Sequence, residues 1–413
     1  MLNNLPRPPV LAVLQQHMDE AGFATVNRQA DIWNPVYEKE DLDHTYKRIR
    51  AHLEGLQVAG EHAIKLAFQL LEKWESESEI FLCAYLLNNA ESSSENHQYY
   101  LTLVEYIEQN EEFIEPASLA LTWAPTDSKF IVTKFWWESS SEHLRAAAFN
   151  AMITFELASI NDVIQAALND SSIYLKQRAC RVVGEGCYHD FSNDLRSILN
   201  EQNAELRYEA AIALTLLNEP DQHSWDALVE TLPLFEDEML QRGIMIWAMF
   251  APAELFQQWY LDHKDKPEQY RSLLWALAYR GDSQYLELIT RFIVNNLEPR
   301  LAAYVFGHIT GLDLDDEEFY LPEEDEGEDD ESDEQDTLDD DSGLIKPDAN
   351  KIIAWFKSNQ DNFSSTENYL AGKPLSESAE EVLEVGTQTQ RIQAAAFLTV
   401  SKKENYLLDA LHK

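Results

Sequence analysis

The chain has 413 residues, and 45% of them are hydrophobic, so it can bury a large core as two or three domains or as one long repeat array. Asp and Glu number 74 against 31 Lys and Arg, which gives a formal net charge of −43. Such a charge repels nucleic acid and anionic membrane surfaces. It favours a macromolecular partner that is basic or that is held by apolar contacts.

The cysteine content and the apolar runs predict a cytoplasmic protein. Three cysteines, Cys83, Cys180 and Cys187, are too few for a disulfide framework, and they lack the two-residue gap of common zinc and redox pairs. We therefore expect reduced thiols. No segment reads as a secretory signal, and no apolar run approaches the roughly 20 residues that span a bilayer.

The first third of the chain predicts helices without a regular repeat. Residues 1–40 form an extended lead-in, because Pro6, Pro8 and Pro9 fix its backbone, followed by a short helix over Val10–Glu20. Residues 41–143 form degenerate helical repeats. The propensity of Lys129–Trp137, which includes Phe-Ile-Val-Thr-Lys-Phe-Trp-Trp, favours a strand, but the helices on both sides favour a helix, which we predict here.

Residues 144–311 predict a regular array of helix pairs. Apolar positions recur at the i, i+3, i+4, i+7 spacing of one buried helical face, as in Leu144, Ala147, Ala148 and Ala151. An Arg stands near the start of one helix in each unit, and successive Arg residues are 33, 29, 35, 29 and 29 positions apart. A period in this range with two helices per unit is typical of an all-α, HEAT-like solenoid.

These Arg residues have two possible roles. At a helix start, an Arg reaches the acidic turn of the adjacent unit and forms an inter-repeat staple of charge-assisted hydrogen bonds. The alternative, a basic binding stripe, is disfavoured by the surrounding acid. The predicted staple residues are Arg145, Arg178, Arg207, Arg242, Arg271, Arg300 and Arg391.

A dense acidic block interrupts the array. Between Asp313 and Asp341 there are 19 Asp or Glu and no Lys or Arg, so we predict a flexible, disordered insertion over 312–345 whose deletion leaves the helices intact. It is a solvated loop, a docking segment for a basic partner, or a DNA-mimicking surface. A calcium site lacks the required D-x-[DN]-x-[DN]-G loop. The candidate partner-binding acids are Asp325, Asp329, Asp330 and Asp333.

After the insertion, residues 346–413 predict C-terminal helices that close the same solenoid. A helix follows Pro347, and a last pair of helices carries the Arg391-Ile392-Gln393-Ala394-Ala395-Ala396 segment, which repeats the Arg-then-Ala pattern.

No motif in the chain indicates catalysis. Phosphate-cradling loops, a nucleophile elbow and H-E-x-x-H are all missing from the sequence, so we predict no catalytic, cofactor-binding or metal-ligating residues and no cofactor. The Trp residues are numerous for a repeat protein. Most should be core, but Trp136, Trp137 and Trp355 are candidates for partner binding on a concave face.

Three blocks of sequence resemble a family of bacterial HEAT-like-repeat proteins whose genes often lie in type VI secretion clusters. They are Ala51-His52-Leu53-Glu54-Gly55-Leu56, Ser118-Leu119-Ala120-Leu121-Thr122-Trp123, and Ile309-Thr310-Gly311-Leu312-Asp313-Leu314 followed by acid, Pro347, Ala354-Trp355-Phe356 and Leu370-Ala371-Gly372. The family tends to have a paired Trp where this chain has Trp355-Phe356. The resemblance implies no catalytic residues.

The resemblance implies a non-catalytic protein-binding scaffold, which acts as an adaptor, chaperone or immunity-like accessory of a type VI secretion system. Its expected partner is a secretion effector, toxin or spike protein, with no nucleic acid and no membrane. Two alternatives stay open: an acidic mimic that inhibits a basic nucleic-acid-binding protein, and an enzyme accessory similar to the HEAT-like phycobilin lyases.

Overall fold

The computed structural model describes residues 9–90, 93–123, 128–314, 316, 318–321, 341, 343–364 and 366–412. It confirms the all-α class, because strands in these ranges are limited to one small antiparallel hairpin, β1 (Tyr369–Leu370) with β2 (Lys373–Pro374). No described helix is long and apolar enough to cross a membrane.

The chain divides into two units. The first unit comprises the residues up to Ile32 together with Glu40–Val183, and the second comprises Trp33–Lys39 and Gly184 onward. The first contains α1 (Leu11–Ile32), α2 (Lys39–Ala59), α3 (Glu61–Trp74), α4 (Glu77–Asn88), α5 (Ser94–Gln109), the 3-10 turn η1 (Glu111–Phe113), α6 (Ile114–Trp123), α7 (Ser128–Trp137), α8 (Glu142–Thr154), α9 (Ile160–Leu168) and most of α10 (Ile173–Glu185).

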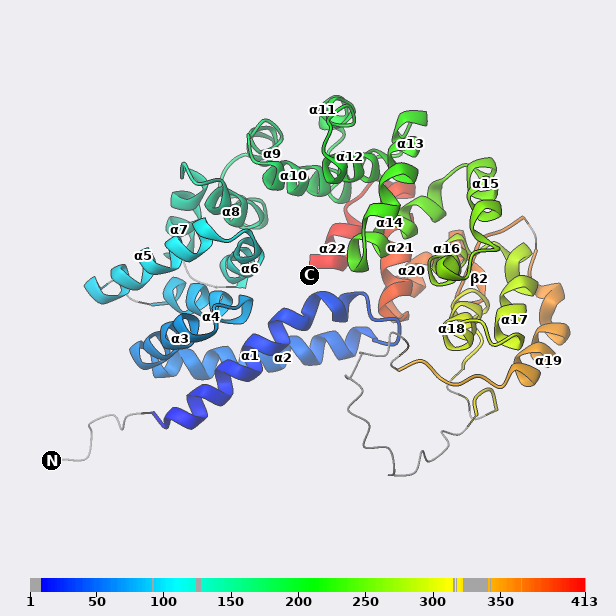
Figure 1. Ribbon diagram of the computed structural model, residues 1–413, viewed down its shortest axis with the longest axis horizontal. Helices are drawn as coiled ribbons and strands as arrows, with labels where there is room; N and C mark the ends of the chain where they lie inside the picture. The colour runs from blue at the N-terminus through cyan, green and yellow to red at the C-terminus, as the bar shows by residue number, and fades with distance from the viewer. Residues whose placement is uncertain are drawn as a thin grey trace. The chain divides into compact units, whose positions relative to one another are not determined.

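The helices of the first unit stack in a row. Helices α4, α6 and α8 pack successively on one another, while α3, α5, α7 and α9 pack beside them (Figure 1). Neighbouring helices of the row pack closely because small side chains lie at their contacts. Those of α8 are Ala146, Ala147, Ala148 and Ala151, all fully buried. The helix predicted over Lys129–Trp137 is confirmed as α7.

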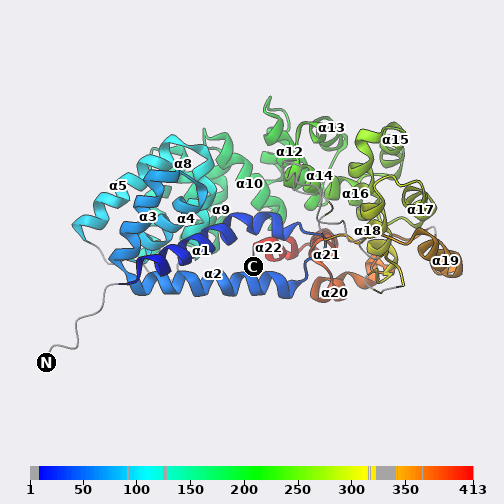
Figure 2. The ribbon, with the colours of Figure 1, turned by 60° about the horizontal axis from the view of Figure 1, so that its bottom comes forward.

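The helix predicted to end at Glu20 is longer than expected. Helix α1 runs to Ile32 and lies beside α2 (Figure 2). Its buried face continues through Ala21 and Thr25, two residues that add little hydrophobicity to the sequence pattern. Thr25 fits in the buried face because its Oγ1 donates a hydrogen bond to the carbonyl of Ala21 at 2.7 Å.

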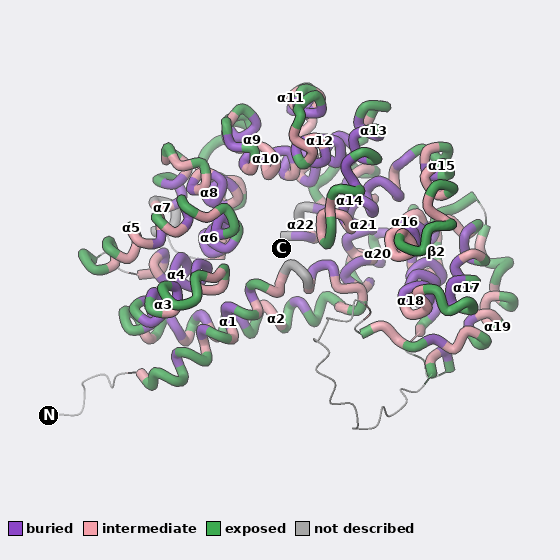
Figure 3. The backbone as a smooth tube through the Cα atoms, in the orientation of Figure 1, coloured by how far each residue is buried: buried purple, intermediate pink, exposed green. Residues whose placement is uncertain are grey.

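The second unit repeats this arrangement with longer rows. Helices α12, α14, α16 and α18 pack successively, and Figure 3 shows them to be largely buried. Helices α11, α13, α15 and α17 pack outside them. The helices of the unit are α11 (Ser192–Ile198), α12 (Ala204–Leu216), α13 (Gln222–Thr231), α14 (Asp237–Phe250), α15 (Ala253–His263), α16 (Tyr270–Arg280), α17 (Leu286–Val294), α18 (Pro299–Thr310), α19 (Ala349–Asn359), α20 (Leu375–Val385), α21 (Gln388–Lys402) and α22 (Tyr406–His412), with short 3-10 turns η2–η6 between them.

The C-terminal helices cover the inner face of this second row. Helix α21 packs against α12 and α14, on the side away from α11 and α13 (Figure 1). Its Gln393 donates from Nε2 to the carbonyl of Tyr279 on α16 at 3.0 Å, and its Oε1 lies 2.6 Å from Nε2 of His308 on α18. The face expected to bind a partner is therefore occupied, in this unit, by the chain's own helix.

The two ends of the predicted flexible insertion are held in place, which corrects its boundaries. Leu312 and Phe319 are buried, and a bridge joins Tyr320 to Pro347. The amide of Leu321 donates to the carbonyl of Lys346 at 2.8 Å. The acids Asp325, Asp329, Asp330 and Asp333 lie outside the described residues.

These contacts change the expected result of deleting the insertion. Replacing residues 322–340 with a Gly-Ser linker of about eight residues should leave the helical circular dichroism and the melting temperature unchanged, because the bridge at its base remains. Deleting 313–341 also removes buried Phe319, and should cost about 2 kcal/mol or more. Equal melting temperatures for both deletions would show that the Phe319 contact does not stabilise the fold.

Candidate interaction surface

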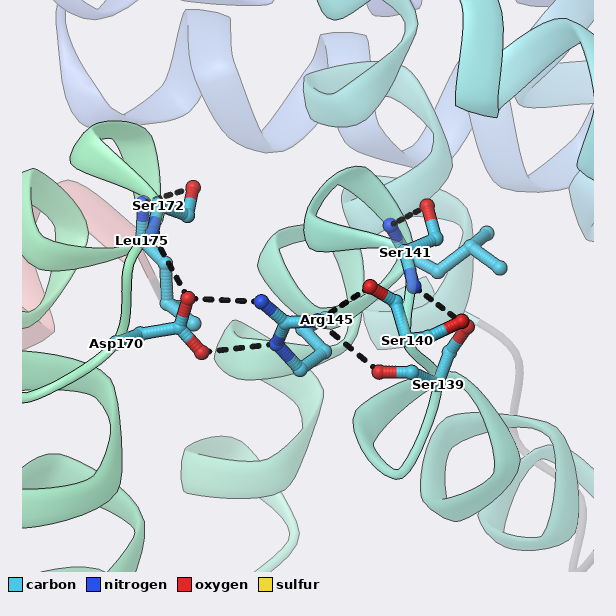
Figure 4. Close-up of polar contacts among 8 residues, drawn as sticks. Ser139, Ser140, Ser141, Arg145, Asp170, Ser172 and Leu175 are labelled. Atoms are coloured by element: carbon cyan, nitrogen blue, oxygen red, sulfur yellow. Dashed lines mark hydrogen bonds and ion pairs between the residues drawn. The ribbon is translucent and has the colours of Figure 1, made fainter.

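Arg145 shows how a capped helix places an Arg against the next turn. Ser141 caps α8 by accepting a hydrogen bond from the Leu144 amide, so Arg145 is the fourth helical residue. Its Nε lies 2.8 Å from Oδ2 of Asp170, and one terminal nitrogen lies 2.8 Å from Oδ1 (Figure 4). The other terminal nitrogen donates to the carbonyls of Ser139 and Ser140 at 3.0 Å. This is a bidentate pair between α8 and the turn after α9.

The electrostatics of this pair favour the charged state of both partners. Burial opposes ionisation of Asp170, but hydrogen bonds from Arg145 and from the Ser172 amide lower the pKa of its carboxyl. The hydrogen bonds to Asp170 raise the pKa of Arg145. Both side chains are less than one-fifth exposed, so solvent screens the pair weakly.

Two further Arg residues reach forward in the same way. Arg207 is the fourth residue of α12, after the Asn203 cap, and lies 2.6 Å from Glu230 on α13. Arg271, near the start of α16, lies 2.7 Å from Glu298, in the turn before α18, and 2.9 Å from Asp341 at the end of the insertion. Asp170, Glu230 and Glu298 follow their Arg partners by 25, 23 and 27 residues. These contacts have the geometry predicted for an inter-repeat staple.

Arg178 and Arg242 reach backward, which the sequence pattern did not predict. Each is the sixth residue of its helix, two positions beyond the place of Arg145 and Arg207 in theirs, whereas Arg271 is the second residue of α16. Two positions rotate a helical side chain by about 200°, so these guanidiniums point to the opposite side. Arg178 pairs with Glu115 on α6, and Arg242 lies 2.8 Å from Glu209 on α12.

Arg391 makes contacts of a different kind. Arg391 donates from Nε to the carbonyl of Leu383 at 3.0 Å, which ties α21 to α20, and it also donates to Gln388 one turn earlier. Arg300 is the second residue of α18.

The forward contacts give a graded prediction for stability. We expect Arg145→Ala to lower the free energy of unfolding by about 2 kcal/mol, because two charge-assisted bonds in a half-buried turn are lost. Arg207→Ala should lower it by only about 0.5 kcal/mol, because Glu230 is 61% exposed. Arg145→Lys keeps the positive charge but not the planar, bidentate guanidinium, so its free energy of unfolding should lie between those of wild type and Arg145→Ala. Chemical denaturation measures all three, and an unchanged value for Arg145→Ala would disprove the staple role.

The structure separates the three predicted partner-binding Trp residues. Trp136 is 1% exposed, and its Nε1 donates to the Tyr100 hydroxyl at 2.6 Å, so that prediction is wrong. A buried Trp needs a partner for its N–H, and α5 supplies it. Trp137 and Trp355 are half-buried, and their rings pack against Phe149 and Phe306.

A different surface of the first unit gathers exposed acid around an exposed Trp. We call it the acidic edge, and it comprises Glu72, Glu75, Glu77, Glu105, Glu111 and Glu112 together with Trp74. These residues come from the end of α3, the start of α4, the end of α5 and η1. Trp74 is 59% exposed, and Nζ of Lys73 lies 4.2 Å from its ring centroid.

Electrostatic interactions connect five of the six Glu residues in two groups. Burial and the charge of Glu112 raise the pKa of Glu77. Burial, then Glu75, Glu72 and Glu105, raise the pKa of Tyr106. Several negative charges on one surface create a negative local potential. The arrangement favours a cationic group beside the Trp74 ring.

Sequence reasoning missed the acidic edge, although a signal was present. Helix α3 ends in Lys73-Trp74-Glu75, and Ser76-Glu77-Ser78-Glu79 follows, so a Trp stands at a helix end among acids. A helix terminus exposes its last side chains because its final turn contacts fewer neighbours. The contribution of Glu105, Glu111 and Glu112 depends on the packing of α5 and η1 beside α3 and α4, which one helix pattern does not reveal.

Together these contacts define an all-α protein of stacked helix pairs joined by Arg–carboxylate pairs. In the described part of the chain, no group of three or more His, Cys, Asp or Glu side chains has a geometry that holds a metal ion. Neither the models of known protein families nor the curated proteins gave a match to the sequence. Membership of the secretion-associated family therefore stays a prediction.

Proposed function

We propose that the chain is a HEAT-like solenoid scaffold that binds a basic protein partner through the acidic edge of its first unit. The observation that carries the proposal is the convergence of six exposed Glu residues from four elements beside the exposed Trp74. The aromatic side chain supplies an anchor for the partner, and the surrounding charge, which is opposite to that of a basic partner, supplies electrostatic steering. The scaffold role follows because stacked helices hold these residues in fixed positions.

The identity of the partner is proposed from the sequence resemblance alone. That resemblance favours an effector, toxin or spike component of a type VI secretion system, with the chain as adaptor, chaperone or immunity-like protein. The net charge of −43 supports a second candidate, an acidic mimic that occupies the binding site of a nucleic-acid-binding protein.

A charge-matched pull-down tests the proposal. Tagged full-length chain captures proteins from a lysate of the source cells at low and at moderate salt, beside two variants that each remove four negative charges. One variant changes Glu72, Glu75, Glu111 and Glu112 to Gln. The control changes Glu377, Glu380, Glu381 and Glu384 of α20 to Gln, four exposed acids in the second unit. A third variant, Trp74→Ala, removes the anchor.

We expect a basic protein that moderate salt releases, that the edge variant and Trp74→Ala fail to capture, and that the α20 control retains. Equal loss in both Gln variants would show that net charge alone attracts the protein. Equal retention in both would exclude the acidic edge. The identity of the captured protein then separates a secretion component from a nucleic-acid-binding protein.

A further inference from the structure

Two histidines face each other across the long helix pair at the start of the first unit. Helices α1 and α2 lie side by side (Figure 2), and polar side chains connect them at three points. Arg48 lies 3.0 Å from Glu20, Nε of Arg28 donates to the Tyr46 hydroxyl at 3.2 Å, and His17 meets His52. Glu20 follows His17 by three residues and therefore lies on the same face of α1.

The geometry of the histidine pair is specific. The two Nδ1 atoms are 2.9 Å apart, and the ring planes are inclined by 66°. Gly55, one turn after His52, makes room for the His17 ring, because a Cβ at that position would lie 3.1 Å from its Nε2. A glycine inside a helix is less favourable than alanine, and here the space that it leaves is filled by an imidazole.

The separation of the two nitrogens matches that of neighbouring ligands on one metal ion. Nitrogens that each lie about 2.05 Å from a metal are about 2.9 Å apart at a right angle and about 3.4 Å apart at the tetrahedral angle. A right angle is the geometry of square-planar and octahedral ions. Imidazole ligands in a square-planar field suit Cu²⁺ and Ni²⁺ better than Zn²⁺.

We propose that His17 and His52 bind a divalent transition-metal ion, with Cu²⁺ and Ni²⁺ preferred, and that the metal joins α1 to α2. Both rings ligate through Nδ1. Water completes the coordination, because no third His, Cys, Asp or Glu side chain of the described residues lies in a position to ligate. In the metal-free pair, one ring donates its Nδ1–H to the other. On binding, that ring becomes its Nε2–H tautomer, so two neutral imidazoles bind without net proton release.

The test uses the metal-stripped full-length chain with CuCl₂, NiCl₂ and ZnCl₂ in separate titrations. A large excess of Mg²⁺ occupies the many surface carboxylates, which prefer hard cations. Calorimetry gives the affinity, and electron paramagnetic resonance of the 1:1 Cu²⁺ sample reports nitrogen ligands by their hyperfine splitting. The variants are His17→Ala and His52→Gln, and His62→Ala is the matched control, an exposed histidine on α3.

We expect one Cu²⁺ site with two coupled nitrogens, and at least a tenfold weaker affinity in His17→Ala and His52→Gln with loss of the two-nitrogen pattern. His62→Ala should behave as wild type, and Ni²⁺ should bind more tightly than Zn²⁺. A wild-type spectrum without two-nitrogen coupling, or one unchanged in His52→Gln, would overturn the proposal and leave a hydrogen-bonded histidine pair. His52→Gln retains a polar side chain between the helices, and circular dichroism checks its fold.

Discussion

Replacing Arg242 with Met is expected to lower the free energy of unfolding by about 3–5 kcal/mol, more than any other Arg substitution in the chain. Arg242 is 2% exposed, and the carboxylates it contacts, Glu209 and Glu185, are 6% and 0% exposed. One of its terminal nitrogens lies 2.8 and 2.9 Å from the two Glu209 oxygens, and the other lies 3.5 Å from Glu185. Without the guanidinium, the buried carboxylate of Glu209 loses its ion pair in a medium of low polarity.

The size of this effect comes from the buried carboxylate of Glu209 that loses its partner, and a second set of variants isolates it. A triple variant, Arg242→Met with Glu209→Leu and Glu185→Gln, removes the charges together and should recover at least half of the loss. Arg291→Met is the matched control, because Arg291 makes only an exposed pair with Glu287 on α17 and should cost less than about 0.5 kcal/mol. Urea denaturation measures each value. A loss below about 1 kcal/mol for Arg242→Met would contradict the account.

Lowering the pH from 7 to 5 is expected to cost about 2 kcal/mol of stability through a single buried histidine. His308 of α18 is buried, and burial lowers its pKa to about 4, against a partial opposing effect of the Gln393 hydrogen bond. Because Gln393 donates from Nε2 to a backbone carbonyl, its Oε1 must accept from Nε2–H of His308. Nδ1 of the histidine is then the acceptor for the Tyr304 hydroxyl at 3.3 Å, and the Tyr304 oxygen accepts from Thr389.

The sign of the pH effect follows from the two protonation states. In the unfolded chain His308 has its ordinary pKa of about 6.5. Between about pH 6.5 and pH 4, the unfolded state binds a proton that the native state excludes. Stability contributed by the neutral His308 is therefore complete above about pH 6.5 and falls by about 1.4 kcal/mol per pH unit below it. A second proton on the ring would also leave Nδ1–H facing the Tyr304 hydroxyl, which already has a donor.

Urea denaturation of wild type and His308→Gln at pH 7 and pH 5 measures this contribution. The variant should be less stable than wild type at pH 7, because the network loses its ring, but the part of the pH dependence due to His308 should vanish. His62→Gln, which changes an exposed histidine, should keep the wild-type dependence. If wild type and His308→Gln lose the same free energy between the two pH values, the native state does not exclude the proton.

The helices were predictable because their signals are local. The apolar residues of α8 and α12 include the i, i+3, i+4, i+7 set that predicted each helix, although the buried surface extends to most sides of both helices. Ser141 and Asn203 cap the two helices at positions readable in the sequence. The predicted end of α1 was wrong because the buried face of the helix continues through Ala21, which is small, and Thr25, which is polar. The ends of the insertion were wrong because Phe319 is buried by contacts with distant segments, although acids surround it in the sequence.

The candidate site was harder to predict, because it depends on which side of a helix a residue occupies. The Arg residues recur at a nearly constant spacing, yet Arg145 reaches forward and Arg178 reaches backward, since they stand fourth and sixth in their helices. Trp136 and Trp137 are neighbours in sequence and differ in exposure for the same reason. A shift of one or two positions rotates a side chain by about 100–200°, which composition and spacing do not register.

The sequence by itself determined the all-α class, the positions of most helices, the acidic character and the recurrence of an Arg near the start of one helix in each sequence repeat. Each of these features depends on residues within one or two helical turns. Only the tertiary structure decided that α21 occupies the inner face of the second row. In the sequence, Thr389 and Gln393 are polar residues typical of a solvated helix face. Both are buried in the fold, because hydrogen bonds to Tyr304, Tyr279 and His308 replace water. Burial of a polar side chain requires partners, and those partners come from helices more than 80 residues away.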